Sequence, residues 1–377
     1  MKHQVVFPRR SLCKSLREGS RKVAEPRKLI VVCDKRAKLE AQSRQQVKRV
    51  SLYHIRKEEG CVFPVVRRNK KILKVLQLLK SGWESNKTIH VVTSKKKGLS
   101  EIEGLYGHDF VQVLKHPEKF DFHRGAPRSG LWSVTKEKSS SVIMETDWNQ
   151  TDILYLRDPL ERDIGVLKTS VEQLLASRVR DVVAVNTHPG HHAGPKRAIN
   201  YCTLNNIAIA AKLLKEAKPN LHIGVLDLDV HPGDGTQEFV EQHQDLIRKY
   251  VSIHCTTKFM NMNSSLGSNG AGLRLDDGGK VIPERFIAKI AEVLTAWNRE
   301  RLHVIIVAMG FDTLKRDPFK VGFQMLPVHF RDIGYMLAQR QEQLFFVQEG
   351  GYNLNETASA FDYLIKGFKR GRCELAS

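Results

Sequence analysis

The sequence predicts an α/β protein whose parallel β-sheet is flanked by helices on both faces. From about residue 151 onward, apolar runs of strand length alternate with longer segments that have helical spacing. This strand–loop–helix order is typical of parallel sheets. Polar motifs rich in His, Asp, Gly and Tyr follow four of the predicted strands. Because open parallel sheets bind ligands at the carboxyl ends of their strands, we expect these motifs to meet in one crevice.

The segments before residue 151 show a weaker pattern. We expect strands at 29–32 and 88–92, and helices at 69–81 and 101–114. Residues 116–150 are polar, contain Gly, Pro and a run of Ser, and are expected to form a long loop. Long loops in compact enzymes often border the active site.

The elements after residue 151 follow one another regularly. The expected strands are 181–185, 222–228, 250–254, 303–309 and 344–347. The expected helices are 159–177, 203–217, 236–248, 283–299, 327–342 and 356–370. Residues 261–280 are rich in Gly, Asn and Ser and are expected to form a loop.

Composition predicts a soluble protein with one large domain over 28–377. The chain has 377 residues, and its apolar content of 41% suffices for a sizeable core. No apolar run has the length of a membrane span, and the N-terminus lacks the apolar core of a secretory signal. The six Cys form no C-x-x-C motif, which argues against a zinc knuckle and a disulfide framework and favours a reducing compartment.

The net charge of +20 is concentrated near the N-terminus, where the first 60 residues hold 17 Lys and Arg against 6 Asp and Glu. We expect residues 1–27 to be poorly ordered. This basic segment is suited to contact nucleic acid, chromatin, an anionic membrane or an acidic partner, or to act as a targeting signal; a solvated tail is the alternative. An intracellular location in nucleus or cytoplasm is expected, and organelle transit stays open.

The segment Asp227 to Asp234 (Asp-Leu-Asp-Val-His-Pro-Gly-Asp) follows an apolar run. Asp227, Asp229 and His231 alternate, so an extended backbone would point them the same way. Three such groups at the end of a buried strand are costly unless something binds them. Asp oxygens with a His nitrogen suit zinc, and a missing protein ligand would leave a position open for water. The alternative is an Asp-rich turn that caps the next helix.

Three further motifs carry side chains suited to catalysis. His191 and His192 are adjacent in a Pro/Gly loop, and Gly190 can supply the geometry that lets both face one cavity. Two imidazoles near a metal suit general acid–base chemistry. Asp312 is the natural third ligand, and Tyr352 on a glycine turn can donate a hydrogen bond to a carbonyl or oxyanion. Taken singly, these motifs also fit surface histidines, a turn Asp and a rim aromatic.

In this order, the motifs resemble the histone deacetylase and acetylpolyamine amidohydrolase superfamily, which has the arginase–deacetylase fold. The resemblance is clear from Asp152 to Asn355, faint over 50–115 and absent from the first 50 residues. The Glu-Gly-Gly-Tyr-Asn form at 349–353 is similar to class II and bacterial members. The resemblance implies a zinc-dependent amidohydrolase that removes acetyl or other acyl groups from N-acetyl-lysine side chains of proteins such as histones.

The resemblance also implies the roles of individual residues. His192 matches the general acid–base histidine and His191 its electrostatic partner. Asp227 and Asp234 match the carboxylates that hydrogen-bond His191 and His192, respectively, and Tyr352 matches the tyrosine that polarises the scissile carbonyl. The implied zinc ligands are Asp229, His231 and Asp312. The implied potassium site is formed by Asp227, Asp229, His231, Ser252 and Ile253.

A tunnel for the acyl-lysine side chain is implied as well. Tyr201 matches one aromatic wall, and the opposite wall falls at Phe259 or Met260. Asn200 stands where the family usually has Gly, and Phe319 is bulkier than expected at the tunnel mouth. The full set of implied tunnel positions is Gly190, Asn200, Tyr201, Phe259, Phe319 and Gly351.

Three other functions compete with protein-lysine deacetylation. Deacetylation of acetylpolyamines or other small amides would need a constricted, acidic rim. An arginase-like dimanganese hydrolase is weakened by the tandem histidines and by the shortage of further metal carboxylates. A non-catalytic basic scaffold that retains the fold is weakened because every catalytic position carries a competent residue.

Overall fold

The computed structural model describes most of the chain from residue 28 onward. The described residues are 28–34, 89–95, 97–125, 131–136, 141–177, 180–255, 270–275, 280–319 and 322–376. The basic segment 1–27, the predicted helix 69–81 and both candidates for the second tunnel wall, Phe259 and Met260, lie outside them.

Within these residues, the larger sheet contains eight parallel strands in the order β10-β9-β8-β11-β12-β6-β1-β2. The strands are β1 Lys28–Asp34, β2 Ile89–Ser94, β6 Arg180–Ala184, β8 Ile223–Asp227, β9 Lys249–His254, β10 Gly270–Arg274, β11 Val304–Met309 and β12 Gln343–Gln348. The central strand β11 is apolar and buried at all 6 positions. Such a continuous apolar run is expected of a parallel strand covered on both faces.

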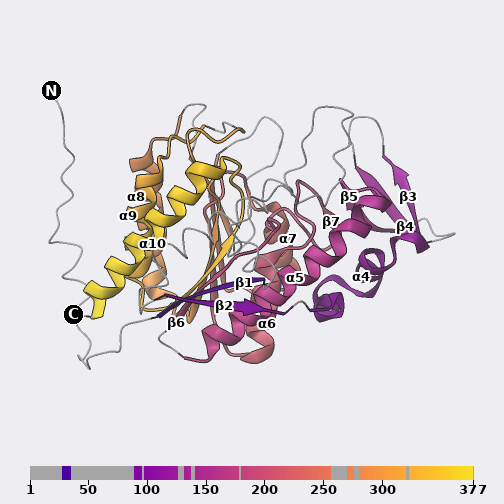
Figure 1. Cartoon of the computed structure of the whole chain (residues 1–377), viewed down its shortest axis with the longest axis horizontal. Coiled ribbons are helices and arrows are strands. Elements are labelled where there is room, and N and C mark those ends of the chain that lie inside the picture. The colour runs from indigo at the N-terminus through magenta and orange to yellow at the C-terminus, as the bar shows by residue number, and fades with distance from the viewer. Residues whose placement is uncertain are drawn as a thin grey trace, which may run out of the picture.

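Helices cover both faces of this sheet, as the sequence predicts (Figure 1). Alternating residues of β11 divide between two cores: Ile305 and Val307 pack with α8, α9 and α10, whereas Val304 and Ile306 pack with α4 to α7. The helices are α3 Glu103–Tyr106, α4 His108–Lys115, α5 Gln150–Leu175, α6 Asn206–Ala217, α7 Asp234–Gln242, α8 Pro283–Ala296, α9 Phe330–Ala338 and α10 Leu354–Ala376. Short 3-10 helices are η1 Leu99–Ile102, η2 Pro117–Lys119, η3 Trp297–Arg299 and η4 Pro327–His329.

A second, four-stranded sheet stands where the sequence predicts a long loop over 116–150. Its strands are β3 Phe120–Arg124, β4 Trp132–Lys136, β5 Val142–Thr146 and β7 Arg197–Ala198. The loop prediction is wrong because these strands are short and partly exposed, so that few positions, such as Val134 and Met144, are both apolar and buried. The predicted loop 261–280 is wrong in part, since it contains β10.

Helix α5 begins at Gln150, well before the predicted start at residue 159. Asn149 and Asp152 form a reciprocal capping box at its first turn. Pro159 lies inside the helix, although proline disfavours helical geometry in the residue before it. The long helix carries Asp163 to the base of the site described below.

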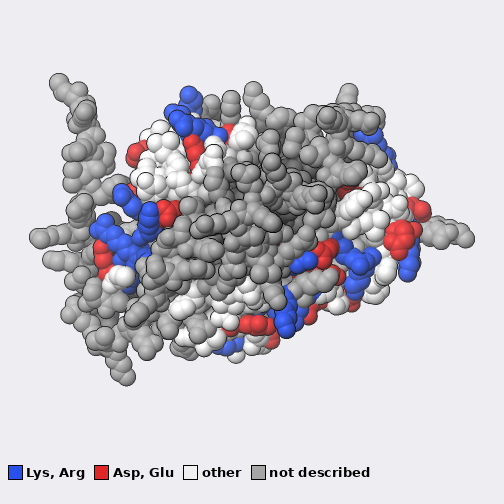
Figure 2. Space-filling view, viewed as in Figure 1, with Lys and Arg blue, Asp and Glu red and all other residues white. Residues whose placement is uncertain are grey.

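The described surface carries charges of both signs. On the face shown in Figure 2, Lys and Arg side chains lie among Asp and Glu side chains. None of the helices in the described ranges combines the length and the apolar content that a membrane crossing requires.

Candidate metal centre and histidine pair

The four polar motifs meet at one edge of the larger sheet. They follow the carboxyl ends of β6, β8, β11 and β12, which are neighbours in the sheet. Because all these strands run parallel, the loops that follow them adjoin one another. The structure therefore brings the four motifs together at one sheet edge, as expected from the sequence.

Asp229, His231 and Asp312 present ligand atoms that all lie within 4.8 Å of one another. His231 Nδ1 is 3.0 Å from Asp229 Oδ1 and 3.3 Å from Asp312 Oδ2. Both carboxylates are buried, whereas the His231 side chain is 18% exposed. Solvent therefore reaches the cluster from its imidazole side.

Two glycines allow the loops to approach this closely. A Cβ atom at Gly350 would overlap Oδ2 of both Asp229 and Asp312, and a Cβ at Gly310 would overlap Asp229. Gly350 N–H donates to Asp229 Oδ2 at 2.7 Å, and Val230 N–H donates to Asp312 Oδ1 at 3.2 Å. Side chains at either glycine would separate the two carboxylates.

The electrostatics of this cluster fit a divalent metal ion. Burial opposes the charged form of His231, but the carboxylates of Asp229 and Asp312 outweigh it and raise the His231 pKa to about 10. Burial and the adjacent Asp229 carboxylate raise the pKa of Asp312. Among the described residues, buried Asp312 Oδ2 has only the longer 3.3 Å contact with His231 Nδ1, which lies closer to Asp229 Oδ1, and no well-formed hydrogen bond. A cation between the two carboxylates would relieve this repulsion and satisfy that oxygen.

His191 and His192 lie side by side, with ring centroids 4.1 Å apart. His191 Nδ1 is 3.1 Å from Asp227 Oδ2, and His192 Nδ1 is 2.5 Å from Asp234 Oδ1. Both contacts join the histidine–carboxylate pairs expected from the sequence. Because an ionised carboxylate only accepts hydrogen bonds, each Nδ1 carries the proton, which leaves Nε2 of a neutral ring as the proton acceptor.

The two histidines have opposite pKa shifts. Burial opposes charge on His191, but Asp229 and Asp227 outweigh it and raise the His191 pKa well above its usual value. Burial and the neighbouring His191 lower the pKa of His192, despite the attraction of Asp234. Such a divergence gives paired groups different roles. His191 is suited to stabilise negative charge, and His192 is suited to act as a base.

Two buried carboxylates anchor the histidine loop, a role that the sequence analysis missed. Asp163 on α5 accepts the backbone N–H of His188 at 3.1 Å and lies 2.8 Å from its ring Nδ1. Glu349 Oε2 accepts the backbone N–H groups of Gly190 at 2.6 Å and His191 at 3.2 Å. An acidic residue on the apolar face of a predicted helix was the available signal for Asp163.

Tyr352 stands at the exposed end of the site. Its backbone N–H donates to Asp317 Oδ2 at 2.7 Å. Its ring centroid lies 4.5 Å from that of Phe319 and 6.5 Å from that of Tyr201. Because Phe319 is 47% exposed, the three aromatic side chains lie where the site meets solvent. Gly351 precedes Tyr352 with a φ of 123°, a conformation that favours glycine.

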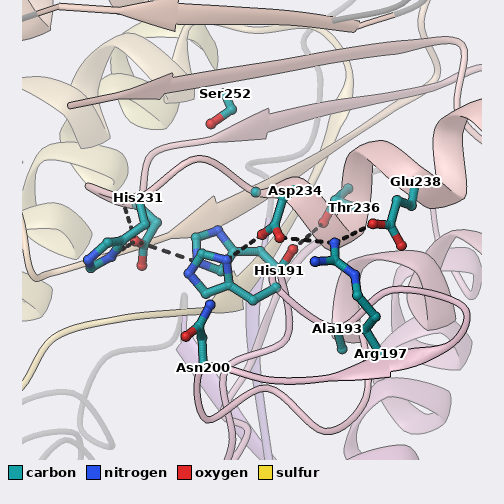
Figure 3. Close-up of polar contacts among 12 residues, drawn as sticks. His191, Ala193, Arg197, Asn200, His231, Asp234, Thr236, Glu238 and Ser252 are labelled. Atoms are coloured by element: carbon teal, nitrogen blue, oxygen red, sulfur yellow. Dashed lines mark hydrogen bonds and ion pairs between the residues drawn. The ribbon is translucent and has the colours of Figure 1, made fainter. Parts of the chain in front are cut away.

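The backbone at Asn200 and Tyr201 is left-handed, with φ values of 53° and 66°. The Asp147 carboxylate accepts the N–H groups of both residues. Asn adopts this conformation more readily than most residues, so it suits a position at which the resemblance implies a Gly. The Asn200 side chain points toward the histidine pair (Figure 3). Gly190 packs so closely on the backbone of Asn206 that a Cβ would not fit.

The residues expected to bind potassium lie on and just after the adjacent strands β8 and β9. Asp227 is the register partner of Ser252. Ser252 and Ile253 are buried, and Ser252 Oγ is 3.0 Å from His254 Nδ1. Asp227 Oδ2 also accepts a hydrogen bond from the Tyr250 hydroxyl at 3.3 Å. The structure brings these residues together, and potassium binding stays a prediction.

Comparisons with known proteins agree with this fold. Among solved structures, the HDA15 HD domain matches with a TM-score of 0.69 at 19% identity, covering 92% of this chain and 90% of that one. The acetylpolyamine aminohydrolase from Burkholderia pseudomallei matches with a TM-score of 0.66 at 18% identity, covering 91% and 99%. At these identities the likeness establishes the fold, which is that of the arginase–deacetylase proteins.

Sequence relatives come from both branches of this superfamily. Histone deacetylase 15 from Arabidopsis thaliana is 28% identical over 213 residues, which cover 54% of this chain and 38% of the relative. Acetylpolyamine amidohydrolase 2 from Pseudomonas aeruginosa is 28% identical over 204 residues, which cover 52% and 58%. The match thus spans between a third and three fifths of these relatives. The histone deacetylase domain matches residues 66–368, and the chain therefore belongs to the histone deacetylase family of hydrolases.

Proposed function

We propose that this chain is a zinc-dependent deacetylase that acts on N-acetyl-lysine side chains of proteins or peptides, histones among them. One observation carries the proposal: His192, whose Nδ1 contacts Asp234, has its ring centroid 5.7 Å from that of His231 in the Asp229–His231–Asp312 cluster. A base thus stands beside a candidate metal site. Zinc is proposed because two carboxylates and one imidazole leave a coordination position open.

The residues divide the work of amide hydrolysis. Asp229, His231 and Asp312 would hold the zinc ion, which would supply Lewis acidity to the amide carbonyl and to water. His192 accepts the proton of the attacking water at Nε2 and then donates a proton to the leaving amine. Asp234 holds His192 Nδ1–H throughout and stabilises its charged form. The positive charge of His191 and the hydroxyl of Tyr352 stabilise negative charge that develops on the substrate oxygen. Acetate and a free amine leave.

Deacetylation of acetylpolyamines is the second candidate. It is favoured by the relatives named acetylpolyamine amidohydrolase, which match with the same 28% identity as the plant histone deacetylase. A dimanganese hydrolase is disfavoured, because the described residues offer a single group of three metal-ligating side chains. Contact with nucleic acid or chromatin through the basic segment 1–27, and a location in nucleus or cytoplasm, remain predictions.

The proposal is tested by turnover of zinc-loaded protein on a panel of acyl-lysine peptides and acetylated polyamines, with and without a hydroxamate. We expect hydroxamate-sensitive release of acetate from acetyl-lysine peptides, and its loss in Asp229→Ala. Turnover of polyamines alone would select the second candidate. Bound zinc without turnover of any substrate would overturn both and leave the scaffold.

A further inference from the structure

Arg197 links two carboxylates on the outer side of the histidine pair. Its Nη2 atom lies 3.0 Å from Asp234 Oδ2 and also donates to Glu238 Oε1. The other oxygen of Asp234, Oδ1, lies 2.5 Å from His192 Nδ1. Figure 3 shows the resulting chain of contacts, which runs from Glu238 through Arg197 and Asp234 toward the histidines.

Local structure determines this arrangement. Asp234 and Glu238 are four residues apart on α7, so both carboxylates face the same side of the helix. Arg197 lies on β7, whose backbone exchanges two hydrogen bonds with Gly194 and pairs with β5 at Glu145. A Cβ at Gly194 would overlap Glu238 Oε2. The segment between the histidines and Tyr201 is therefore shaped to bring a guanidinium against the first turn of α7.

Burial makes the link to Asp234 effective. Asp234 is 6% exposed, while the side chains of Arg197 and Glu238 are 25% and 34% exposed. A buried carboxylate with a single imidazole partner would bear an uncompensated lone pair and an unbalanced charge. Arg197 satisfies that second oxygen, and Glu238 holds the guanidinium in place from the solvent side.

The second histidine–carboxylate pair has different supports. Besides His191, Asp227 Oδ2 receives the Tyr250 hydroxyl at 3.3 Å, and Asp227 Oδ1 receives the Asp229 N–H at 3.1 Å. These donors are neutral, whereas the donor to Asp234 is a cation. The guanidinium thus supports the carboxylate that contacts His192, the histidine proposed as the base, and not the carboxylate that contacts His191.

We propose that Arg197, held by Glu238, is a positioning residue for His192. Its guanidinium fixes the Asp234 carboxylate in the orientation that holds the His192 Nδ1–H, so that Nε2 remains the proton acceptor. The proposal rests on the proposed deacetylase function. According to it, the ion pairs of Arg197 with Asp234 and Glu238 affect the rate of the reaction, although they contact neither the metal cluster nor Tyr352.

The test compares Arg197→Gln, Arg197→Lys and Glu238→Gln in zinc-loaded full-length protein. Loss of a group that orients a metal ligand typically costs ~10- to 100-fold in metal affinity or activity. By analogy, we expect Arg197→Gln to lower kcat by ~10- to 100-fold and to change KM much less. Arg197→Lys should recover part of kcat, because an ammonium can still reach Asp234 Oδ2. Glu238→Gln, which leaves the guanidinium in place, should lower kcat by less than Arg197→Gln does. Arg162→Gln is the matched control, since Arg162 is 26% exposed and pairs with Asp158 on α5.

A second readout does not depend on turnover. In protein with ¹⁵N-labelled histidine, the imidazole proton shared by His192 and Asp234 should give a slowly exchanging, strongly downfield NMR signal that Asp234→Asn identifies. It should persist in Arg197→Lys and broaden or vanish in Arg197→Gln. An unchanged signal and kcat in Arg197→Gln, or equal losses in the Gln and Lys variants, would overturn the positioning role. A wild-type protein that shows this signal but has no deacetylase activity would instead remove the proposed function.

Discussion

At the scale of single residues, the site places chemically similar groups in different surroundings. His191 and His192 are adjacent and both buried, yet two carboxylates face the first and a charged ring faces the second. Tyr352 stands apart from them, half-buried among aromatic rings at the edge of the crevice. Each side chain can therefore be tested by a substitution that leaves the metal cluster in place.

Tyr352→Phe should abolish most turnover and retain zinc. The variant keeps the ring that packs on Phe319 but loses the hydroxyl proposed to stabilise the substrate oxygen. Removal of one such donor typically lowers kcat by ~10²- to 10³-fold. The measurement is kcat together with zinc per chain, with Tyr155→Phe, an exposed tyrosine on α5, as the control. Full activity in Tyr352→Phe would remove this role.

Asn200→Gly should broaden the range of acyl groups that the enzyme accepts. Glycine adopts the φ of 53° without strain, so the backbone held by Asp147 is retained while the side chain that points toward the histidine pair is lost. We expect the ratio of kcat/KM for a longer acyl-lysine peptide to that for the acetyl peptide to rise. The same ratio in both proteins would show that Asn200 does not restrict the tunnel.

At the scale of elements, buried carboxylates hold the loops that carry the site. Asp163 ties α5 to the histidine loop, Asp317 ties its own loop to Tyr352, and Glu349 at the end of β12 holds the N–H groups of Gly190 and His191. Burial raises the pKa of Glu349 from its ordinary 4.5 to about 7, against the attraction of His191. The anchoring of the histidine loop therefore affects how stability depends on pH.

Glu349→Gln should change that pH dependence in metal-free protein. Between pH 4.5 and about 7 an unfolded chain loses the Glu349 proton while the folded chain retains it, so this group lowers stability as pH rises through that window. Gln keeps an oxygen for the two N–H groups and has no proton to lose. As pH rises across the window, the difference in unfolding free energy between the variant and wild type should therefore shift in favour of the variant. The shift is up to ~3 kcal/mol, because one pKa unit corresponds to about 1.36 kcal/mol.

Denaturant unfolding in the presence of a chelator, at several pH values, provides the measurement. Glu292→Gln, a change at an exposed residue of α8 that pairs with Lys289, is the control and should not alter the pH profile. A difference between Glu349→Gln and wild type that stays constant with pH would contradict the prediction.

The central strands of the larger sheet, which are buried on both faces, could be predicted from the sequence, whereas the partly exposed strands of the second sheet could not. The apolar run of β11 identified its strand and the strand's place in a parallel sheet. In β4 only Val134 and Thr135 are buried, and in β5 only Met144 and Thr146 are, so the sequences of these strands resemble the polar loop expected there. The capping box at Asn149 is a local signal for the start of α5 that the sequence analysis did not use.

The same limit applies to the whole molecule. Asp229, His231 and Asp312 could be predicted because each directly follows a buried strand whose end is fixed by the sheet. The contact between Arg197 and Glu238 could not be predicted. It joins a two-residue strand to the second turn of a helix, and no regular spacing in the sequence indicates it. Contacts between loops that are distant in sequence require the folded chain.

Metal binding should therefore stabilise the entire fold and not only the crevice. The cluster joins the loops after β8 and β11, and Gly350 N–H, in the loop after β12, donates a hydrogen bond to Asp229. An ion that relieves the repulsion between Asp229 and Asp312 therefore stabilises the loops at the centre of the larger sheet. Free zinc at one hundred times its Kd adds about 2.7 kcal/mol to the free energy of unfolding.

Chelated protein should show a rise in Tm on zinc addition, and Asp312→Ala should lose that response. Asp332→Ala, which removes an exposed carboxylate on α9, should keep it. If Asp312→Ala responded to zinc as wild type does, the ion would bind elsewhere, and the metal centre proposed at this sheet edge would have to be abandoned.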